Sequence, residues 1–279
     1  MGITKTDFMR GMQCPRMLWL DKHKPSLRVI PPETQQRLDA GNDFGDRAMG
    51  MFGPYEEMTV YRPGTKIPDK KKMVERTKEH LLRGTDVICE AAFMDYNNYC
   101  AADILKKTGT GYDLYEVKNT AEVREQFVLD AAFQWYIIGR CGVMVGKVFI
   151  VTHGPDEEHP FVPVEITDRA RAYLKWVGDH IWDLNRQWKL KDEIMTPPGD
   201  QCMDPYPCWY YDHCHGTEAT LLDFISEGRL TRPRVLKPSP KLMCKGQNPL
   251  RTAKTTSWPS LTPRSTKCAL RIWPTAPIA

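Results

Sequence analysis

GTDVICEAAFMDYNNYCAADILKKTGTGYDLYEVK, residues 84–118, is the stretch that decides the fold of this 279-residue chain. It contains three apolar runs of strand length with several β-branched and aromatic residues. The runs are separated by DYNN at 95–98 and TGTG at 108–111, whose Asp, Asn and Gly residues favour tight turns. The stretch therefore predicts strands over 87–94, 99–106 and 112–118, joined by two turns.

Helical patterns surround these strands on both sides. Helices are predicted over 6–20, 32–51, 69–82, 121–139 and 166–190, and a further apolar strand over 146–152. Helices around a hairpin-rich sheet make an α/β or α+β domain. We expect one such domain over residues 1–216.

The last part of the chain has a different composition. Eleven of the 39 Lys and Arg residues and eight prolines lie after Gly228, and none of the 35 Asp and Glu residues does. Residues 1–228 therefore carry 28 basic and 35 acidic side chains. A segment of this kind buries too little apolar surface to offset the entropy lost on ordering. We predict that 217–279 is a disordered basic tail; a frame-shifted gene end and a nucleic-acid-binding tail are the alternatives.

The sequence favours a cytoplasmic protein with no membrane segment. The most apolar stretch, 143–151, is short and holds Lys147, and the N-terminus lacks the apolar core of a signal peptide. Thiols stay reduced in the cytosol, so the nine cysteines are more often ligands than disulfides there. No protein partner is indicated.

Two carboxylates stand near the ends of predicted strands that are otherwise apolar. Asp103 and Glu116 are costly in such strands unless they meet a cation or a donor. Cleavage of a phosphodiester uses a hard cation held by oxygen ligands, which Asp103, Glu116 and the Val117 carbonyl would supply. Lys118 lies on the same strand face as Glu116 and would orient the attacking water, and Glu90 on the preceding strand would add a ligand. The alternative is a solvated salt bridge on a surface hairpin.

The D-x12-E-x-K pattern of Asp103, Glu116 and Lys118 resembles the PD-(D/E)XK motif of RecB-like nucleases. The helix that holds Gln134 is similar to the glutamine helix of that group, and the resemblance covers residues 4–216. It implies an α/β fold, with a mixed sheet flanked by helices and with N- and C-terminal segments joined by a metal cluster.

The same resemblance implies a function. The chain is similar to the CRISPR-associated RecB-like exonucleases, which implies a Mg²⁺- or Mn²⁺-dependent deoxyribonuclease. Single-stranded DNA or DNA ends are the expected substrate, in recombination, repair or defence. The implied catalytic residues are Glu90, Asp103, Glu116, Lys118 and Gln134.

Three cysteines, Cys202, Cys208 and Cys214, follow one another at C-x5-C-x5-C spacing, and Cys14 lies far upstream. Four thiolates can hold a 4Fe–4S cluster. The resemblance implies that Cys14 and the C-terminal trio do so and that the cluster ties the two ends of the domain together. A zinc site, with help from His213 or His215, is the alternative. Cys89, Cys100 and Cys141 lie in apolar segments and are interpreted as core residues.

A second class of function remains open at this point: an iron–sulfur nucleic-acid-binding module whose nuclease core is inactive. The basic residues of the first helix, Lys5, Arg10 and Arg16, are interpreted as a solvated helix face, with phosphate contacts as the alternative.

Overall fold

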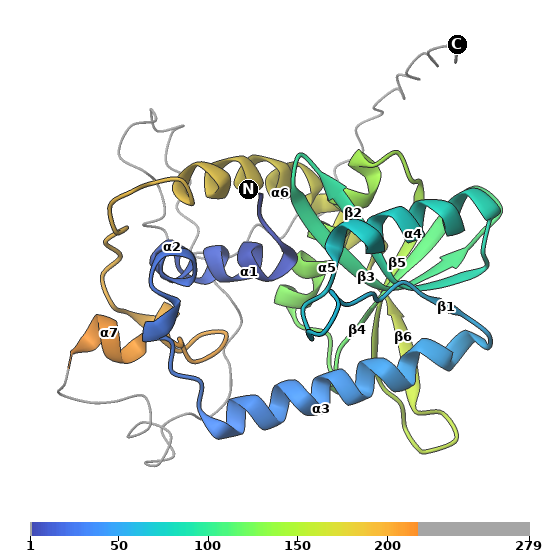
Figure 1. Cartoon of the computed structure of the whole chain (residues 1–279). Helices are drawn as coiled ribbons and strands as arrows, with labels where there is room; N and C mark the ends of the chain where they lie inside the picture. The colour runs from blue at the N-terminus through green and yellow to red at the C-terminus, as the bar shows by residue number, and fades with distance from the viewer. Residues whose placement is uncertain (1, 217–279) are drawn as a thin grey trace, which may run out of the picture. The chain divides into compact units, whose positions relative to one another are not determined.

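The three strands expected between residues 87 and 118 form the centre of a mixed sheet in the computed structural model, which describes residues 2–216 (Figure 1). They are β2 (Val87–Asp95), β3 (Asn98–Lys107) and β4 (Tyr112–Val117), paired antiparallel in chain order. The chain divides into two units, Met1–Leu236 and Lys237–Ala279, and every described residue belongs to the first. The predicted tail, 217–279, lies outside the described residues.

Three further strands complete a six-stranded sheet of order β1-β2-β3-β4-β5-β6 among the described residues. β5 (Val145–His153), predicted from its apolar run, lies parallel to β4. The two edge strands, β1 (Glu56–Glu57) and β6 (Phe161–Glu165), were not predicted. β1 is two acidic residues long, and β6 carries Pro163 and is mostly exposed, so neither has the apolar alternation of a buried strand.

Helices flank the sheet and connect its strands. α3 (Pro32–Ala48), α4 (Lys70–Arg83), α5 (Glu125–Arg140) and α6 (Thr167–Gln187) correspond to four of the predicted helices. α5 is the crossover between the parallel strands β4 and β5, as a parallel pair requires. None of the helices between residues 2 and 216 is long and apolar enough to cross a membrane.

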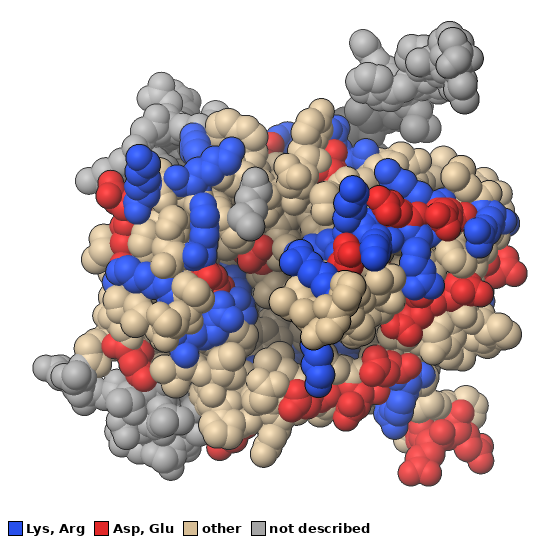
Figure 2. All heavy atoms as spheres, viewed as in Figure 1, with Lys and Arg blue, Asp and Glu red and all other residues tan. Residues whose placement is uncertain are grey.

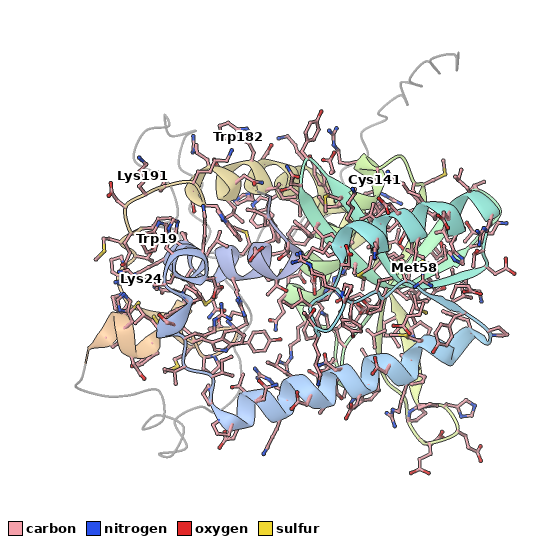
Figure 3. All side chains as sticks on the ribbon, in the orientation of Figure 1. Trp19, Lys24, Met58, Cys141, Trp182 and Lys191 are labelled. Atoms are coloured by element: carbon pink, nitrogen blue, oxygen red, sulfur yellow. The ribbon has the colours of Figure 1, made fainter. Side chains whose placement is uncertain are left out.

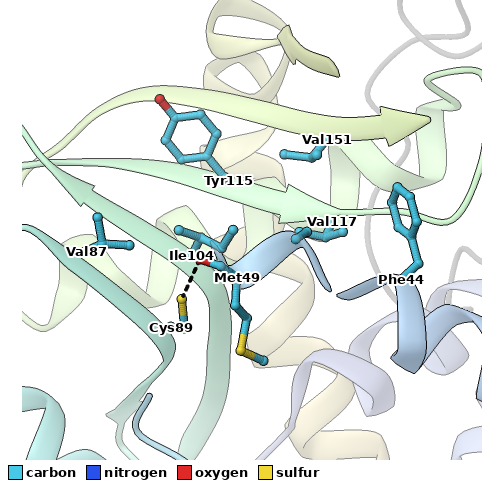
Figure 4. Close-up of a cluster of buried hydrophobic side chains, with 9 residues drawn as sticks. Phe44, Met49, Val87, Cys89, Ile104, Tyr115, Val117 and Val151 are labelled. Carbon is cyan, nitrogen blue, oxygen red and sulfur yellow. Dashed lines mark hydrogen bonds between the residues drawn. The ribbon is translucent and has the colours of Figure 1, made fainter. Parts of the chain in front are cut away.

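The two faces of the sheet are covered by different helices. Figure 4 shows the cluster on one face, where Phe44 and Met49 from the end of α3 and the turn after it meet Ile104, Tyr115 and Val117. Side chains alternate between the two faces along a strand. Asp103, next to Ile104, and Glu116, between Tyr115 and Val117, therefore point to the opposite face. α5 packs on that face of the sheet, so both carboxylates lie against a buried helix.

The predicted helix over 6–20 is wrong as a single element. The structure has α1 (Lys5–Gln13) and α2 (Pro15–His23), separated by Cys14 in an extended conformation with φ −159° and ψ 118°. Pro15 has no N–H to donate and disfavours a helical conformation in the residue before it. The break places Cys14 at the corner between two helices, beside the C-terminal segment that ends in the short helix α7 (Tyr211–His215) (Figure 1).

Candidate active site

Asp103 and Glu116 come together where the pairing of β3 with β4 ends. The last paired residues are Ile104 and Tyr115; beyond them, Asp103 Oδ2 accepts a hydrogen bond from the Val117 N–H at 2.7 Å. The carboxylate thus takes the place of a main-chain acceptor and is held in a fixed position. Its second oxygen, Oδ1, is left to face the interior of the site.

Glu116 is 1% exposed and is surrounded by donors. Lys118 Nζ lies 2.5 Å from Oε1, Lys5 Nζ lies 3.1 and 3.2 Å from the two oxygens, and Gln134 donates to Oε2. Burial acts to raise the pKa of Glu116, but the charges of Lys118 and Lys5 outweigh burial and hold this pKa far below its ordinary value. Glu116 is therefore an anion that requires cations.

α5 supplies the opposite wall of the site. Gln134 is fully buried, and Asp130, one turn earlier, accepts from Lys118 Nζ at 2.6 Å. The two lie four residues apart, which places both side chains on the helix face that meets β4. The role of Asp130 was not predicted, although the i, i+4 spacing to Gln134 on an apolar helix is a signal that could have found it.

Glu90 lies across from Asp103 on β2. The pairs on either side of them, Cys89 with Ile104 and Ala91 with Ala102, place the two residues opposite each other. Glu90 has φ 53°, in the left-handed region that is unfavourable for a residue with a side chain. Burial and the facing Asp103 raise the pKa of Glu90 to about 8, and burial and Glu116 raise the pKa of Asp103 to about 6. Two carboxyls held opposite each other in this way are destabilising without a cation.

A pH dependence of stability follows from Glu90. A carboxyl whose pKa is raised on folding stabilises the folded state while it is protonated, and this contribution is lost as the pH rises through the folded-state pKa. In EDTA, the free energy of unfolding of the wild-type protein should fall between pH 6 and pH 9 by at least about 1 kcal/mol more than that of Glu90→Gln. Urea unfolding at the two pH values measures the difference, with Glu122→Gln, an exposed loop residue, as the control. Parallel pH profiles for Glu90→Gln and wild type would show that Glu90 ionises normally.

Lys5 is a second site residue whose role sequence reasoning missed. It was interpreted as part of a solvated helix face, but its ammonium contacts Glu116 and lies 3.7 Å from Asp103 Oδ1. Burial lowers the pKa of Lys5, but the nearby carboxylates, those of Asp130 and Glu116 foremost, outweigh burial and raise it well above its usual value. Arg10 and Arg16 likewise form ion pairs, with Asp21 and Glu193.

The donor set of this site fits a hard cation. Between residues 2 and 216, no three His, Cys, Asp or Glu side chains stand ready around one point as a metal-ion site. The donor types nevertheless match: Asp103 and Glu116 both reach the Lys5 ammonium, at 3.7 and 3.1 Å, and within the described chain the buried oxygens Asp130 Oδ1 and Gln134 Oε1 have no hydrogen-bond donor. Oxygen-rich, buried and anionic surroundings of this kind suit Mg²⁺ or Mn²⁺.

The structure also brings four cysteines from the two ends of the domain to one cavity. Cys14, Cys202, Cys208 and Cys214 line it together with apolar and aromatic side chains such as Met17 and Tyr210. Burial, with the other thiols adding to it, raises the pKa of Cys208 to about 12. A thiol that resists ionisation in this way would become a thiolate only with a metal to hold it.

Hydrogen bonds join the same two chain segments around the cavity. Gln13, at the end of α1, donates to the main-chain oxygens of Gln201 at 2.9 Å and Tyr206 at 2.7 Å. Of the two histidines of the zinc alternative, His213 lies 3.2 Å from Glu193, whereas His215 stacks on Tyr211 and its buried Nε2 has no hydrogen-bond partner within the described chain.

The remaining cysteines differ from one another in burial. Cys89 and Cys100 are buried, as predicted, but Cys141 is exposed at the end of α5 (Figure 3). The apolar residues before Cys141 belong to the buried part of α5, whereas Cys141 itself follows the last helical residue and precedes the turn at Gly142. The interpretation of Cys141 as a core residue was therefore wrong.

Fold and site together define an α/β protein with a six-stranded mixed sheet, flanking helices and a buried cluster of carboxylates and lysines. No protein-family model matches the chain, and no curated protein matches it. The solved structures that are similar at a distance include two examples. One is described as the crystal structure of SSO0001, with 13% identity, a TM-score of 0.31 and coverage of 69% of this chain and 78% of that one.

The second solved structure is LHK-Exo in complex with dAMP, with 11% identity, a TM-score of 0.38 and coverage of 67% of this chain and 90% of that one. Likenesses this remote assign neither a family nor an activity to the chain. Its function is therefore inferred from the site.

Proposed function

We propose that this protein is a metal-dependent DNA nuclease of the PD-(D/E)XK, RecB-like type. The observation that carries the proposal is the convergence of Asp103 and Glu116, from adjacent strands, with Lys118 and Gln134 in one buried site. A purely structural salt bridge would need neither a second carboxylate opposite Asp103 nor a glutamine aimed at Glu116. The site instead concentrates negative charge, as a cation site requires.

Each residue has a distinct task in this proposal. Asp103 Oδ1, Glu116 and the Val117 carbonyl would hold Mg²⁺ or Mn²⁺, which when bound polarises the phosphate and lowers the pKa of a water. Lys118, aligned by Asp130, orients the attacking water and offsets charge that develops on the phosphate. Gln134 holds Glu116 in place through its amide. Glu90 supplies a further acidic group on the side of Asp103.

We further propose that Cys14, Cys202, Cys208 and Cys214 hold a 4Fe–4S cluster in a reducing, cytoplasmic environment. Support comes from their position around one cavity and from the softness of thiolate ligands. The cluster's role here is structural, because phosphodiester hydrolysis needs no electron transfer. It would join the helix corner at Cys14 to the end of the domain.

The substrate of the proposed reaction is DNA, single-stranded or with free ends. Lys and Arg side chains are interspersed with Asp and Glu on the face drawn in Figure 2. Arg37 lies over the ring of Tyr206, and such a pair can stack on bases and contact phosphates.

One observation favours the second candidate function, a nucleic-acid-binding module with an inactive core. The ammonium of Lys5 lies between Asp103 and Glu116 and already neutralises part of their charge. A core that keeps this arrangement permanently would not bind a divalent cation.

A cleavage assay separates the two functions. The full chain, purified without oxygen and treated with EDTA, is mixed with end-labelled single- and double-stranded DNA, with and without Mg²⁺ or Mn²⁺. We expect cleavage to require the added metal and to stop when EDTA is restored, because the carboxylates cannot activate water alone. DNA that binds but stays intact at all metal concentrations would favour the inactive module and contradict the nuclease.

A further inference from the structure

We propose that Lys5 is a built-in competitor of the catalytic cation: its ammonium occupies the position between Asp103 and Glu116 and leaves it when a divalent cation binds. This inference rests on the proposed metal site and adds a regulatory element to it. No part of it follows from the sequence pattern, in which Lys5 is an ordinary residue at the start of a helix.

The contacts of Lys5 are with the same oxygens that a metal would use. Asp103 Oδ2 is committed to the Val117 N–H, so Oδ1 is its available oxygen, and Lys5 Nζ lies 3.7 Å from that atom. The same ammonium lies 3.1 and 3.2 Å from the two oxygens of Glu116. A cation that coordinates both carboxylates would occupy the same space, and two positive charges there would repel each other strongly.

Main-chain hydrogen bonds position Lys5 beside Asp103 and Glu116. Tyr99 N–H donates to the Ile3 carbonyl at 2.9 Å, and the Ile3 N–H donates to Asn98 Oδ1, which fixes the segment before α1 to the start of β3. Thr4 and Asp7 then form a capping box that starts the helix at Lys5.

The body of α1 is held as firmly as its start. Phe8 is fully buried, with its ring centroid 4.8 Å from that of Phe133 on α5. Lys5 is thus delivered to the site by an anchored helix, and its contacts with the carboxylates differ from those of a surface lysine in free solvent.

Lys5 differs from Lys118 in how easily it can leave. Lys118 is held at short range by both Asp130 and Glu116, at 2.6 and 2.5 Å. Lys5 has the longer contacts, at 3.1 to 3.7 Å, whereas the exposed fractions of the two side chains, 24% and 21%, are nearly equal. The weaker contacts let its flexible four-carbon chain carry the charge toward solvent while α1 stays in place. A divalent cation would therefore displace the ammonium of Lys5, whereas Lys118 would keep its contacts with Asp130 and Glu116 during the reaction.

The first test is a titration of the EDTA-treated full chain with Mn²⁺, with free Mn²⁺ followed by electron paramagnetic resonance. Lys5→Met keeps the apolar stem and removes the charge, so it should bind Mn²⁺ about tenfold more tightly than wild type or better. Lys175→Met, at an exposed position of α6, is the control and should leave the affinity unchanged. Equal affinities of Lys5→Met and wild type would overturn the inference while leaving the metal site in place. No Mn²⁺ binding by either protein would overturn the metal site as well.

The second test uses the wild-type chain and distinguishes release of Lys5 from simple repulsion at a distance. Lysines are acetylated briefly with and without saturating Mg²⁺, and the modified positions are quantified by mass spectrometry. Mg²⁺ should raise the labelling of Lys5 severalfold and leave that of Lys175 unchanged. Labelling of Lys5 that does not respond to Mg²⁺ would show that its ammonium stays in the site, and the proposed displacement would be wrong.

Discussion

Asp103→Asn should lower the rate of metal-dependent DNA cleavage by at least about 100-fold while the protein stays folded. The amide oxygen of Asn can still accept the hydrogen bond from the Val117 N–H, so the link between β3 and β4 is kept. The negative charge that would hold the cation is lost. Glu116→Gln should have an effect of the same size, because it removes the charge with which Lys118 and Lys5 pair.

Asp113→Asn is a closely matched control. Asp113 lies on β4, and its Oδ1 accepts the Lys147 N–H at 2.7 Å, as Asp103 Oδ2 accepts the Val117 N–H at the same distance. The two variants therefore undergo the same chemical change at the same kind of strand contact, but only Asp103 faces the site. Single-turnover cleavage with Mg²⁺ measures the rates, and thermal unfolding checks the fold. Cleavage by Asp103→Asn at the rate of Asp113→Asn would remove Asp103 from the active site.

Replacing any one of Cys14, Cys202, Cys208 and Cys214 with Ser should remove the brown colour expected of the anaerobically purified protein, which should hold about four irons per chain. Cys14 and Cys202 are 188 residues apart, so a cluster between them closes a very long loop. Loss of that closure should lower the free energy of unfolding by about 5 kcal/mol. Cleavage should fall as well, because α1 ends at Gln13, beside Cys14, and packs through Phe8 on α5, the helix that supplies Gln134 to the site.

The control for the cysteine variants is Cys141→Ser. Cys141 is exposed, and its replacement should keep both colour and stability. Iron content, visible absorption and thermal unfolding of the five variants are compared with wild type. A colourless protein with one tightly bound zinc would replace the cluster with a zinc site on the same four cysteines. A brown Cys14→Ser variant would exclude Cys14 as a ligand.

Local sequence patterns were sufficient to predict most of the central strands and helices. β2, β3 and β4 were predicted because their apolar runs end at turns whose residues favour tight backbone conformations, and these signals lie within a few residues of one another. Asp103, Glu116 and Lys118 were singled out as charges in apolar strands, and the structure places the three together. Their catalytic roles stay predictions until the variants are measured.

Other features needed the folded chain. The break at Cys14 was missed because the helical periodicity on both sides of Pro15 masked it, although proline itself was the local signal. The edge strands β1 and β6 pair only because β2 and β5 are already in place beside them. The role of Asp130 became evident only from its contact with Lys118.

The sequence by itself was enough to predict the hairpins and to select the carboxylates within them and the four cysteines. Each of these features can be recognised from residue types and their spacing along the chain. Only the tertiary structure decided which charges meet. Glu90 faces Asp103 because of strand register, and Lys5 reaches Glu116, 111 residues away, because α1 is anchored beside the start of β3. Contacts between distant segments depend on how helices pack on the sheet, and a lysine at the start of a helix carries no sign in its own sequence of the carboxylates that it will meet.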